Sequence, residues 1–265
     1  MYSTFRLAKK YLHYYLTAAN GKGHGIHSPF VYDFVSKVMR DKKEDSCYPA
    51  IEKERTQLIN DGRTIEVQDF GAGSSMKTEK KRVVKDIARS SLKNKKFARL
   101  LFRIVTYYQS QNIIELGTSL GITTSYLAKA NPSAKVYTLE GSPNIAGIAA
   151  GNFRNLGISN IELITGKFEN TLPPLLQKIP VVDLAFIDGN HQKEPTLLYF
   201  KWLSAKINPS SILIFDDIHW SKEMEEAWAF IREDALVTLS IDLFFMGIVF
   251  FSDDFKAKQH FTIRF

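Results

Sequence analysis

The segment that most constrains the fold is residues 112–124, where a short apolar run leads into two glycines and a helix-like stretch. Ile113 and Ile114 have β-branched side chains, which are typical of a buried strand. Gly117 permits a tight turn, and Gly121 lets the backbone approach a ligand at the first turn of the next helix. A strand that ends in such a turn and helix is typical of nucleotide-cofactor sites in open α/β sheets.

A carboxylate follows at the distance that such a fold predicts. The next expected strand, residues 135–139, leads into Glu140, which lies 23 residues after Gly117. Doubly wound sheets place an acidic side chain near this distance, against the hydroxyls of a ribose. The glycines are spaced G-x-x-x-G, so the third glycine of the G-x-G-x-x-G pattern, which helps to seat a pyrophosphate, is missing. The pattern therefore favours a cofactor that has a ribose and no pyrophosphate.

From residue 111 the chain alternates between expected strands and helices. The expected strands are 112–116, 135–139, 160–164, 182–187 and 211–215; the helices are 122–130, a segment between Ser142 and Gly157, 194–205 and 222–232; a turn is expected at Gly166 to Phe168. Repeated strand-helix units require a parallel sheet. Residues 237–242 and 247–251 are joined too closely for a helical crossover, so we expect them to pair as an antiparallel hairpin. The sequence thus predicts a doubly wound, mostly parallel α/β sheet of seven strands with a closing hairpin.

The first third is expected to be a mainly helical extension, residues 1–90, before a cofactor domain at 91–265. Expected helices are 2–18, 28–39, 49–60, 78–90 and 95–109, with a strand-like segment at 64–70. Residues 21–29 form a glycine-rich loop with His24 and His27, which we interpret as a linker more readily than as a metal site or an active-site lid. Residues 69–74 resemble a cofactor loop, but no second strand with an acidic end follows, so no site is predicted there.

The positive charge belongs to the extension. Residues 1–110 hold 22 basic and 11 acidic residues, whereas residues 111–265 hold 13 and 17. The densest basic stretch is 77–99, and no aromatic residue interrupts it before Phe97. We favour a solvated helical face over a site for RNA or another polyanion, because basic runs on helices are common. Nucleic acid is therefore an open but not a favoured partner.

Other features of the composition restrict the class of protein. The single cysteine, Cys47, excludes an intrachain disulfide framework and fits a reducing cytoplasm. The most apolar run, residues 243–251, has the length of a strand, so we expect no membrane span. Arg6, Lys9 and Lys10 precede no apolar h-region, so no signal peptide is expected. These observations favour a cytoplasmic protein.

Four blocks of sequence together resemble one family. They are Glu115-Leu116-Gly117 with Gly121, then Glu140, then residues 183–191, then residues 212–217. In this order they resemble the class I S-adenosylmethionine-dependent methyltransferases, and within them the metal-dependent O-methyltransferases of the catechol O-methyltransferase type and their sugar-modifying relatives. The resemblance covers about residues 90–265. It implies a Rossmann-like methyltransferase fold and an enzyme that methylates a hydroxyl oxygen of a small-molecule acceptor; a homodimer stays open.

The resemblance also implies where S-adenosylmethionine binds. Glu115 orients the methionine end through the turn, and Glu140 accepts hydrogen bonds from both ribose hydroxyls. Lys167 departs from the family pattern, in which a residue that accepts from the adenine amino group is common at this place. The implied cofactor residues are Glu115, Gly117, Thr118, Ser119, Gly121, Thr123, Glu140, Gly141, Gly166, Lys167, Phe168 and Asp188.

Three carboxylates end neighbouring expected strands: Asp188, Asp216 and Asp217. Hard oxygen ligands with room for water and substrate suit Mg²⁺ or Mn²⁺, and the resemblance implies a divalent cation that binds the acceptor hydroxyls. The alternative is that Asp216 and Asp217 only cap a loop in a metal-free site. His191 falls where the family carries a lysine or histidine general base, a role that suits imidazole, and His219 is the reserve candidate.

The sequence leaves the acceptor and two other functions open. Trp220, Trp228 and Phe244 would either wall an acceptor pocket or belong to the core. A sugar hydroxyl, a catechol-like phenol and a modified nucleotide all stay open as acceptors. The rival functions are a non-catalytic module of this fold that binds nucleic acid through the basic helices, and a nicotinamide-dependent oxidoreductase. The missing third glycine and the terminal hairpin disfavour the oxidoreductase.

Overall fold

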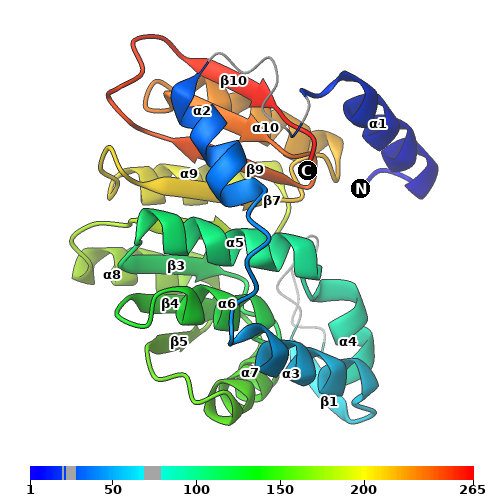
Figure 1. Cartoon of the computed structure of the whole chain (residues 1–265). Coiled ribbons are helices and arrows are strands. Elements are labelled where there is room, and N and C mark those ends of the chain that lie inside the picture. Colours follow the sequence, from blue (N-terminus) through cyan, green and yellow to red (C-terminus); the bar gives the residue numbers. More distant parts are fainter. Residues whose placement is uncertain (20, 22–27, 69–78) are drawn as a thin grey trace. The chain divides into compact units, whose positions relative to one another are not determined.

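The computed structural model describes residues 1–19, 21, 28–68 and 79–265 (Figure 1). They divide into two compact units. One, the continuous unit, is Lys42–Lys178; the other, the split unit, combines Met1–Asp41 with Ile179–Phe265. This division by compactness differs from the domain boundary expected near residue 90, which stays a prediction. The interpretations of His24, His27 and residues 69–74 fall outside the described residues.

The continuous unit contains the first strands of the expected parallel sheet. Its elements are α3 (Tyr48–Asn60), β1 (Thr64–Gln68), β2 (Glu79–Val83), α4 (Val84–Ser91), α5 (Lys95–Tyr108), β3 (Asn112–Leu116), α6 (Ile122–Ala130), β4 (Lys135–Glu140), α7 (Pro143–Asn155), β5 (Ile161–Thr165) and α8 (Phe168–Lys178). β4 pairs in parallel with β3 on one side and with β5 on the other (Figure 1). The carboxyl ends of these three strands therefore lie at one edge, as the strand-helix alternation predicts.

Aromatic packing joins the helices of the continuous unit. Tyr48 of α3 meets the ring of Phe102 of α5 edge-on, with 5.0 Å between ring centroids. Tyr126 of α6 is fully buried in the same cluster, and its hydroxyl donates to Glu52 Oε1 at 2.7 Å. A buried tyrosine whose hydroxyl finds an acceptor stabilises the core without an unpaired polar group.

Two expectations for the continuous unit are wrong in detail. The helix expected at 78–90 begins only at Val84, because residues 79–83 form β2 and pair antiparallel with β1. The strand pairing gives hydrogen-bond partners to the backbone amides and carbonyls of β1. If residues 79–83 were helical, these groups of β1 would lose those partners. The turn at Gly166 leads into α8, which the sequence did not predict; it contains Pro173 and Pro174, and prolines inside a helix argue against one.

The split unit carries the later strands and the first helices. Its elements are α1 (Thr4–Thr17), α2 (Pro29–Asp33), the π-helix η1 (Phe34–Met39), β6 (Leu184–Ile187), α9 (Lys193–Ser204), β7 (Ile212–Asp216), α10 (Lys222–Glu233), β8 (Leu239–Asp242), β9 (Met246–Phe250) and β10 (Gln259–Thr262). β6 and β7 are parallel, and β9 pairs antiparallel with both β7 and β8. The expected closing hairpin is thus confirmed, and so is the mostly parallel α/β fold class. β10, which runs parallel to β8, was not predicted.

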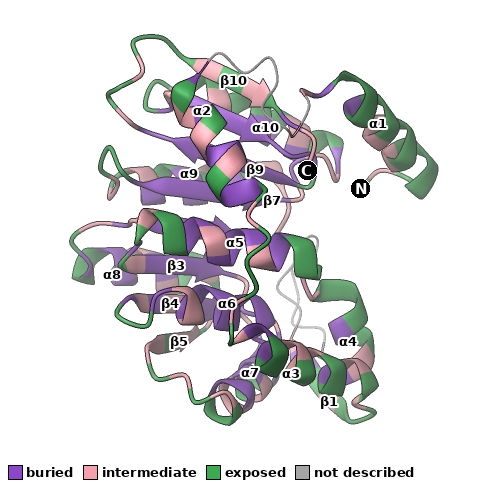
Figure 2. Cartoon of the chain, in the orientation of Figure 1, coloured by how far each residue is buried: buried purple, intermediate pink, exposed green. Residues whose placement is uncertain are grey.

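The expected helix at 28–39 is present as α2 followed directly by η1, and it buries one side. Val31, Phe34 and Val38 have no exposed surface, whereas Tyr32 is 51% exposed. The ribbon of α2 accordingly carries both buried and exposed residues (Figure 2). Phe34 and its neighbour Phe30 both meet the ring of Phe250 of β9 edge-on, at 5.8 and 5.1 Å between centroids. Residues 1–41 therefore contribute to the core of the split unit. Within the described part of the chain, no helix combines the length and the apolar character needed to cross a membrane.

Candidate functional site

The turn after β3 depends on glycine at two positions. Gly117 has φ 104° and Gly121 has φ 80°, which side chains other than glycine rarely adopt. The amides of Gly117 and Thr118 both donate to the carbonyl of Leu139, which ties the turn to the end of β4. A Cβ at Gly121 would lie 2.5 Å from the ring of Phe153 of α7. The close packing of α6 against α7 thus explains why a glycine is needed at position 121. The expected approach of its backbone to a ligand stays a prediction.

Glu115 lies beneath this turn and has no exposed surface. Its Oε2 accepts from Thr124 Oγ1 at 2.5 Å and from Thr138 Oγ1 at 2.6 Å. Thr138 has one hydroxyl proton, which it donates to Glu115. Thr118 Oγ1 is therefore the donor in the 2.6 Å hydrogen bond between Thr118 and Thr138. The carboxylate of Glu115 therefore joins β3, β4 and α6. The expected role of Glu115, to orient the cofactor through the turn, stays a prediction.

Glu140 occupies the end of β4 and reaches across to the same turn. Its Oε2 accepts from the amide of Ser119 and its Oε1 from the amide of Ser142, both at 2.9 Å. Burial raises the pKa of Glu140, and the amides of Ser142, Ser119 and Gly141 oppose that rise. The two oxygens of a carboxylate have four lone pairs together, so three amides do not exhaust the capacity of Glu140 to accept from a ligand. This is the arrangement that a pair of ribose hydroxyls requires.

The segment expected to wall the adenine lies beside Glu140. Gly166 has φ 142°, and its amide donates to the carbonyl of Glu140 at 2.9 Å. The carbonyl of Lys167 accepts from the amides of Asn170 and Thr171, which starts α8, and Phe168 is the first residue of that helix. All predicted cofactor residues except Asp188 thus belong to the continuous unit and lie in or beside the turns that follow β3, β4 and β5.

The split unit brings together three of the predicted site residues. One ligand atom from each of Asp188, His191 and Asp216 lies within 4.8 Å of the other two. His191 Nε2 and Asp188 Oδ1 are 3.6 Å apart. Asp188 follows β6 and Asp216 ends β7, so parallel pairing of these strands brings both carboxylates to one edge. Asn190 and His191 have φ values of 68° and 38°, a strained loop of the kind that is concentrated at functional sites.

Asp217 is not a member of this group among the described residues. It also has a positive φ, 53°. Its amide donates to the carbonyl of Phe245 at 2.7 Å, and its own carbonyl accepts from the amide of Trp220 at 2.9 Å. Both the amide and the carbonyl of Asp217 are thus hydrogen-bonded, which holds the backbone of the loop after β7. His191 stands in the group where the sequence analysis expected Asp217.

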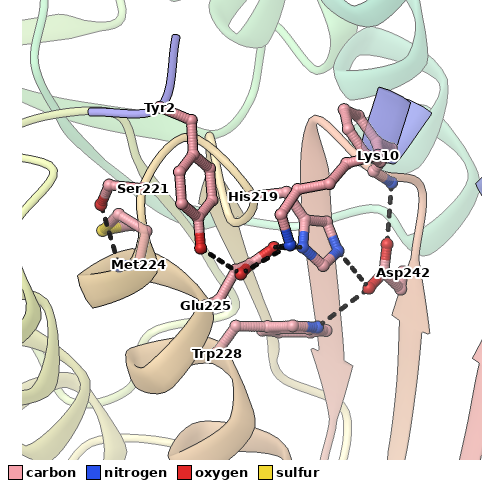
Figure 3. A network of polar contacts seen from close by, with 9 residues as sticks. Tyr2, Lys10, His219, Ser221, Met224, Glu225, Trp228 and Asp242 are labelled. Atoms are coloured by element: carbon pink, nitrogen blue, oxygen red, sulfur yellow. Dashed lines mark hydrogen bonds and ion pairs between the residues drawn. The ribbon is translucent and has the colours of Figure 1, made fainter. Parts of the chain in front are cut away.

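His219, the reserve base, belongs to a network of its own (Figure 3). Its Nδ1 lies 3.0 Å from Glu225 Oε1 and its Nε2 lies 2.8 Å from Asp242 Oδ2. Burial lowers the pKa of His219, but the hydrogen bonds and charges of Asp242 and Glu225 outweigh it and raise the pKa above its usual value. The ring also stacks on Phe244 at 5.1 Å. Both ring nitrogens are engaged, so the geometry favours His191 over His219 as a base.

The same network explains the aromatic residues that were considered as pocket walls. Phe244 and Trp228 are 2% and 3% exposed, and Trp228 Nε1 donates to Asp242 Oδ2 at 3.2 Å. They are core residues, and Trp220 alone of the three is partly exposed. Glu225 and Asp242 were missed by the sequence analysis. Glu225 lies on a helix with many charged residues and Asp242 ends a strand. Neither local sequence indicates that both side chains hydrogen-bond to His219.

Comparison with known proteins finds similarity to methyltransferases. Residues 114–218 match a family model described as a methyltransferase domain. A catechol O-methyltransferase from Niastella koreensis is 33% identical over 126 residues, which are 46% of this chain and 55% of that protein. The chain spans about half the length of the curated relatives that it matches.

Two solved structures are similar in fold. One is the O-methyltransferase TomG from Streptomyces achromogenes in complex with SAM, with 18% identity and a TM-score of 0.58 over 84% of this chain and 95% of that one. The other is an O-methyltransferase from Bacillus cereus in complex with SAH, with 18% identity and a TM-score of 0.56 over 83% and 96%. At this identity the likeness establishes the fold alone.

Proposed function

We propose that this chain, which carries a methyltransferase domain at residues 114–218, transfers a methyl group from S-adenosylmethionine to a hydroxyl oxygen of a small molecule with the help of a divalent cation. Residues 91–265 form the catalytic domain in this proposal, and residues 1–90 form an extension. The observation that carries the proposal is the carboxylate of Glu140 between the amides of Ser119 and Ser142. A carboxylate held beside the glycine turn supports a ribose site there.

The cofactor supplies a methyl group on a sulfonium, which is already an activated electrophile. The chain therefore has to bind the two reactants, hold them in line and remove a proton. Glu140 holds the ribose, and the turn from Gly117 to Gly121 faces the remainder of the cofactor. Gly166 and Phe168 lie beside Glu140, where the adenine would be held.

The side chains of Asp188, His191 and Asp216 suit a divalent cation. Two carboxylates are hard oxygen ligands of the kind that Mg²⁺ and Mn²⁺ prefer, and Mn²⁺ also accepts an imidazole. The geometric group contains His191 and not Asp217. On the family resemblance we nevertheless propose Asp188, Asp216 and Asp217 as the ligands, with His191 assigned to acid-base chemistry. A bound cation would lower the pKa of an acceptor hydroxyl and orient it.

His191 is proposed as the general base. Its Nε2 faces Asp188, which leaves Nδ1 to accept the proton of the acceptor hydroxyl. Histidine is the side chain that most often acts as a general base, so it suits the removal of this proton. The ring lies close to the carboxylates of Asp188 and Asp216, in a loop with positive φ values at Asn190 and His191.

The similarity to a catechol O-methyltransferase supports a phenolic hydroxyl as the acceptor. Sugars and modified nucleotides are the other acceptors to test. Calorimetric titration of the full chain with S-adenosylmethionine, S-adenosylhomocysteine and NAD should give heats for the first two only. S-adenosylhomocysteine release is then measured with panels of catechols, phenols, sugars and nucleosides. Binding of NAD without S-adenosylmethionine would overturn the proposal.

The metal is tested separately from turnover. We expect Mn²⁺ to bind the protein, as detected by electron paramagnetic resonance, and binding to weaken at least tenfold in Asp216→Asn. Asp253→Asn is the matched control, because Asp253 is exposed and far from the group in sequence. Loss of Mn²⁺ binding in His191→Ala but not in Asp217→Asn would make His191 a ligand and contradict its role as base.

A further inference from the structure

Helix α1 presents apolar side chains on two opposite faces. The inner face, with Leu7, Tyr11, Tyr14 and Ala18, packs against Phe244. The outer face carries Phe5, Leu12 and Leu16, which we call the outer stripe; they are 82%, 58% and 70% exposed. Residues seven and four apart lie on the same side of a helix, so the outer stripe is continuous. Figure 2 shows much of α1 as exposed.

Contacts within the split unit hold α1 in this orientation. Tyr2 Oη and Lys10 Nζ both donate to the carboxylate of Glu225, at 2.7 and 2.8 Å (Figure 3). The amide of Tyr2 donates to the carbonyl of Trp220. Tyr14 Oη donates to the carbonyl of Ile263 from the inner face. The helix therefore cannot bury its outer stripe by rotating, because rotation would break these contacts.

The charge around the outer stripe is of one sign. α1 contains Arg6, Lys9 and Lys10 and no acidic residue, and Asp33 is the first acidic residue of the chain. Lys10 is occupied by Glu225, whereas Arg6 and Lys9 are exposed. Lys9 follows Phe5 by four residues, which places it on the side of the outer stripe.

We infer that the outer stripe docks α1 onto an anionic lipid surface. An interfacial helix of this kind inserts phenylalanine and leucine between acyl chains while lysine and arginine meet the anionic headgroups. A second copy of α1 on the same face would bring like charges together, which disfavours self-association through the outer stripe. A nucleic acid would meet the cations but not the three apolar side chains. The helix lies on the surface, since it is too short to span a bilayer.

The test is co-sedimentation of the full chain with vesicles. We expect binding to phosphatidylcholine vesicles that contain 30% phosphatidylglycerol, and about tenfold weaker binding to phosphatidylcholine alone or in high salt. Serine at all three positions of the outer stripe should weaken binding at least tenfold. Lys9→Glu should weaken binding to the anionic vesicles several-fold.

The matched control replaces Phe230 and Leu236 with serine, because these residues of the split unit are 58% and 51% exposed but do not belong to α1. It should bind vesicles as the parent protein does. Far-ultraviolet circular dichroism and urea melts of each variant verify folding. Absence of binding to anionic vesicles, equal loss in the control, or a dimer in light scattering that dissociates in the serine variant would each overturn the inference.

Discussion

Glutamine in place of Glu140 tests the proposed cofactor site with a change of one atom. The amide retains one acceptor oxygen, so only one of the two amides, Ser119 or Ser142, retains its partner. The ribose hydroxyls lose an ionised acceptor, and hydrogen bonds to charged groups contribute on the order of 1.5–3 kcal/mol. A loss of about 2 kcal/mol corresponds to a dissociation constant for S-adenosylhomocysteine about 30-fold higher, measured by calorimetry.

The pH dependence of this binding has a defined sign. Burial raises the pKa of Glu140 above its usual value of 4.5 in the unbound protein. The hydroxyls need the ionised carboxylate, so affinity should fall as the pH falls through the raised pKa. In Glu140→Gln the affinity should be flat over the same range. Stability of the unbound protein runs the opposite way: the stabilising contribution of a raised carboxyl pKa is present below 4.5 and is lost as the pH rises through the folded pKa.

Glu162→Gln is the matched control. Glu162 is an exposed residue of the neighbouring strand β5, and it lies 3.4 Å from Lys135. Its substitution should leave cofactor affinity unchanged, because a surface ion pair contributes little. An unchanged dissociation constant in Glu140→Gln, or a pH profile parallel to that of the parent protein, would refute the assignment of Glu140 to the ribose.

The remaining predictions concern the base and the core. His191→Ala should lower turnover roughly 10²–10⁴-fold with cofactor affinity intact, measured as S-adenosylhomocysteine formation across pH. His219→Ala should instead lower the free energy of unfolding by about 1–3 kcal/mol in urea melts, because it removes the ring's hydrogen bonds to two charged side chains, Glu225 and Asp242; if it alone removes the near-neutral step of the activity profile, His191 is not the base. Gly247→Ala should cost about 1–3 kcal/mol, since a Cβ there would lie 2.7 Å from the ring of Trp228. Gly147→Ala, whose Cβ meets nothing, should stabilise the protein by up to about 1 kcal/mol, and equal effects of the two substitutions would contradict the packing argument.

Local patterns explain what the sequence could predict. The strand at 112–116, the turn from Gly117 to Gly121 and the helix after Ser142 each depend on neighbouring residues, and the structure has them at the expected places. The place of Glu140 at the end of β4 could be predicted because the distance along a strand-helix-strand unit is nearly fixed. The proximity of Asp188 and Asp216 could be predicted because the carboxyl ends of parallel strands lie at one edge of a sheet.

Pairings between distant segments were not visible in the sequence. β10 is four residues long with alternating burial, and only its partner β8 makes it a strand. β2 has a polar, basic sequence that would suit a helix, and β1 determines its conformation. The engagement of His219 by Glu225 and Asp242 requires α10 and β8 to be in place. These features follow from tertiary contacts that no local pattern encodes.

The split unit imposes an order on synthesis. Met1–Asp41 leaves the ribosome first, yet the strands it packs with begin only after Ile179. At about 5–20 residues per second, that segment waits roughly 7–28 s before its partners begin to be made. During this time Lys42–Lys178 emerges whole and can fold, while the apolar side chains of Val31 and Phe34, which have no exposed surface in the finished protein, have no native partners. Nascent chains arrested before Ile179 should therefore be cleaved by protease within residues 28–41, and chains that include residues 179–265 should not.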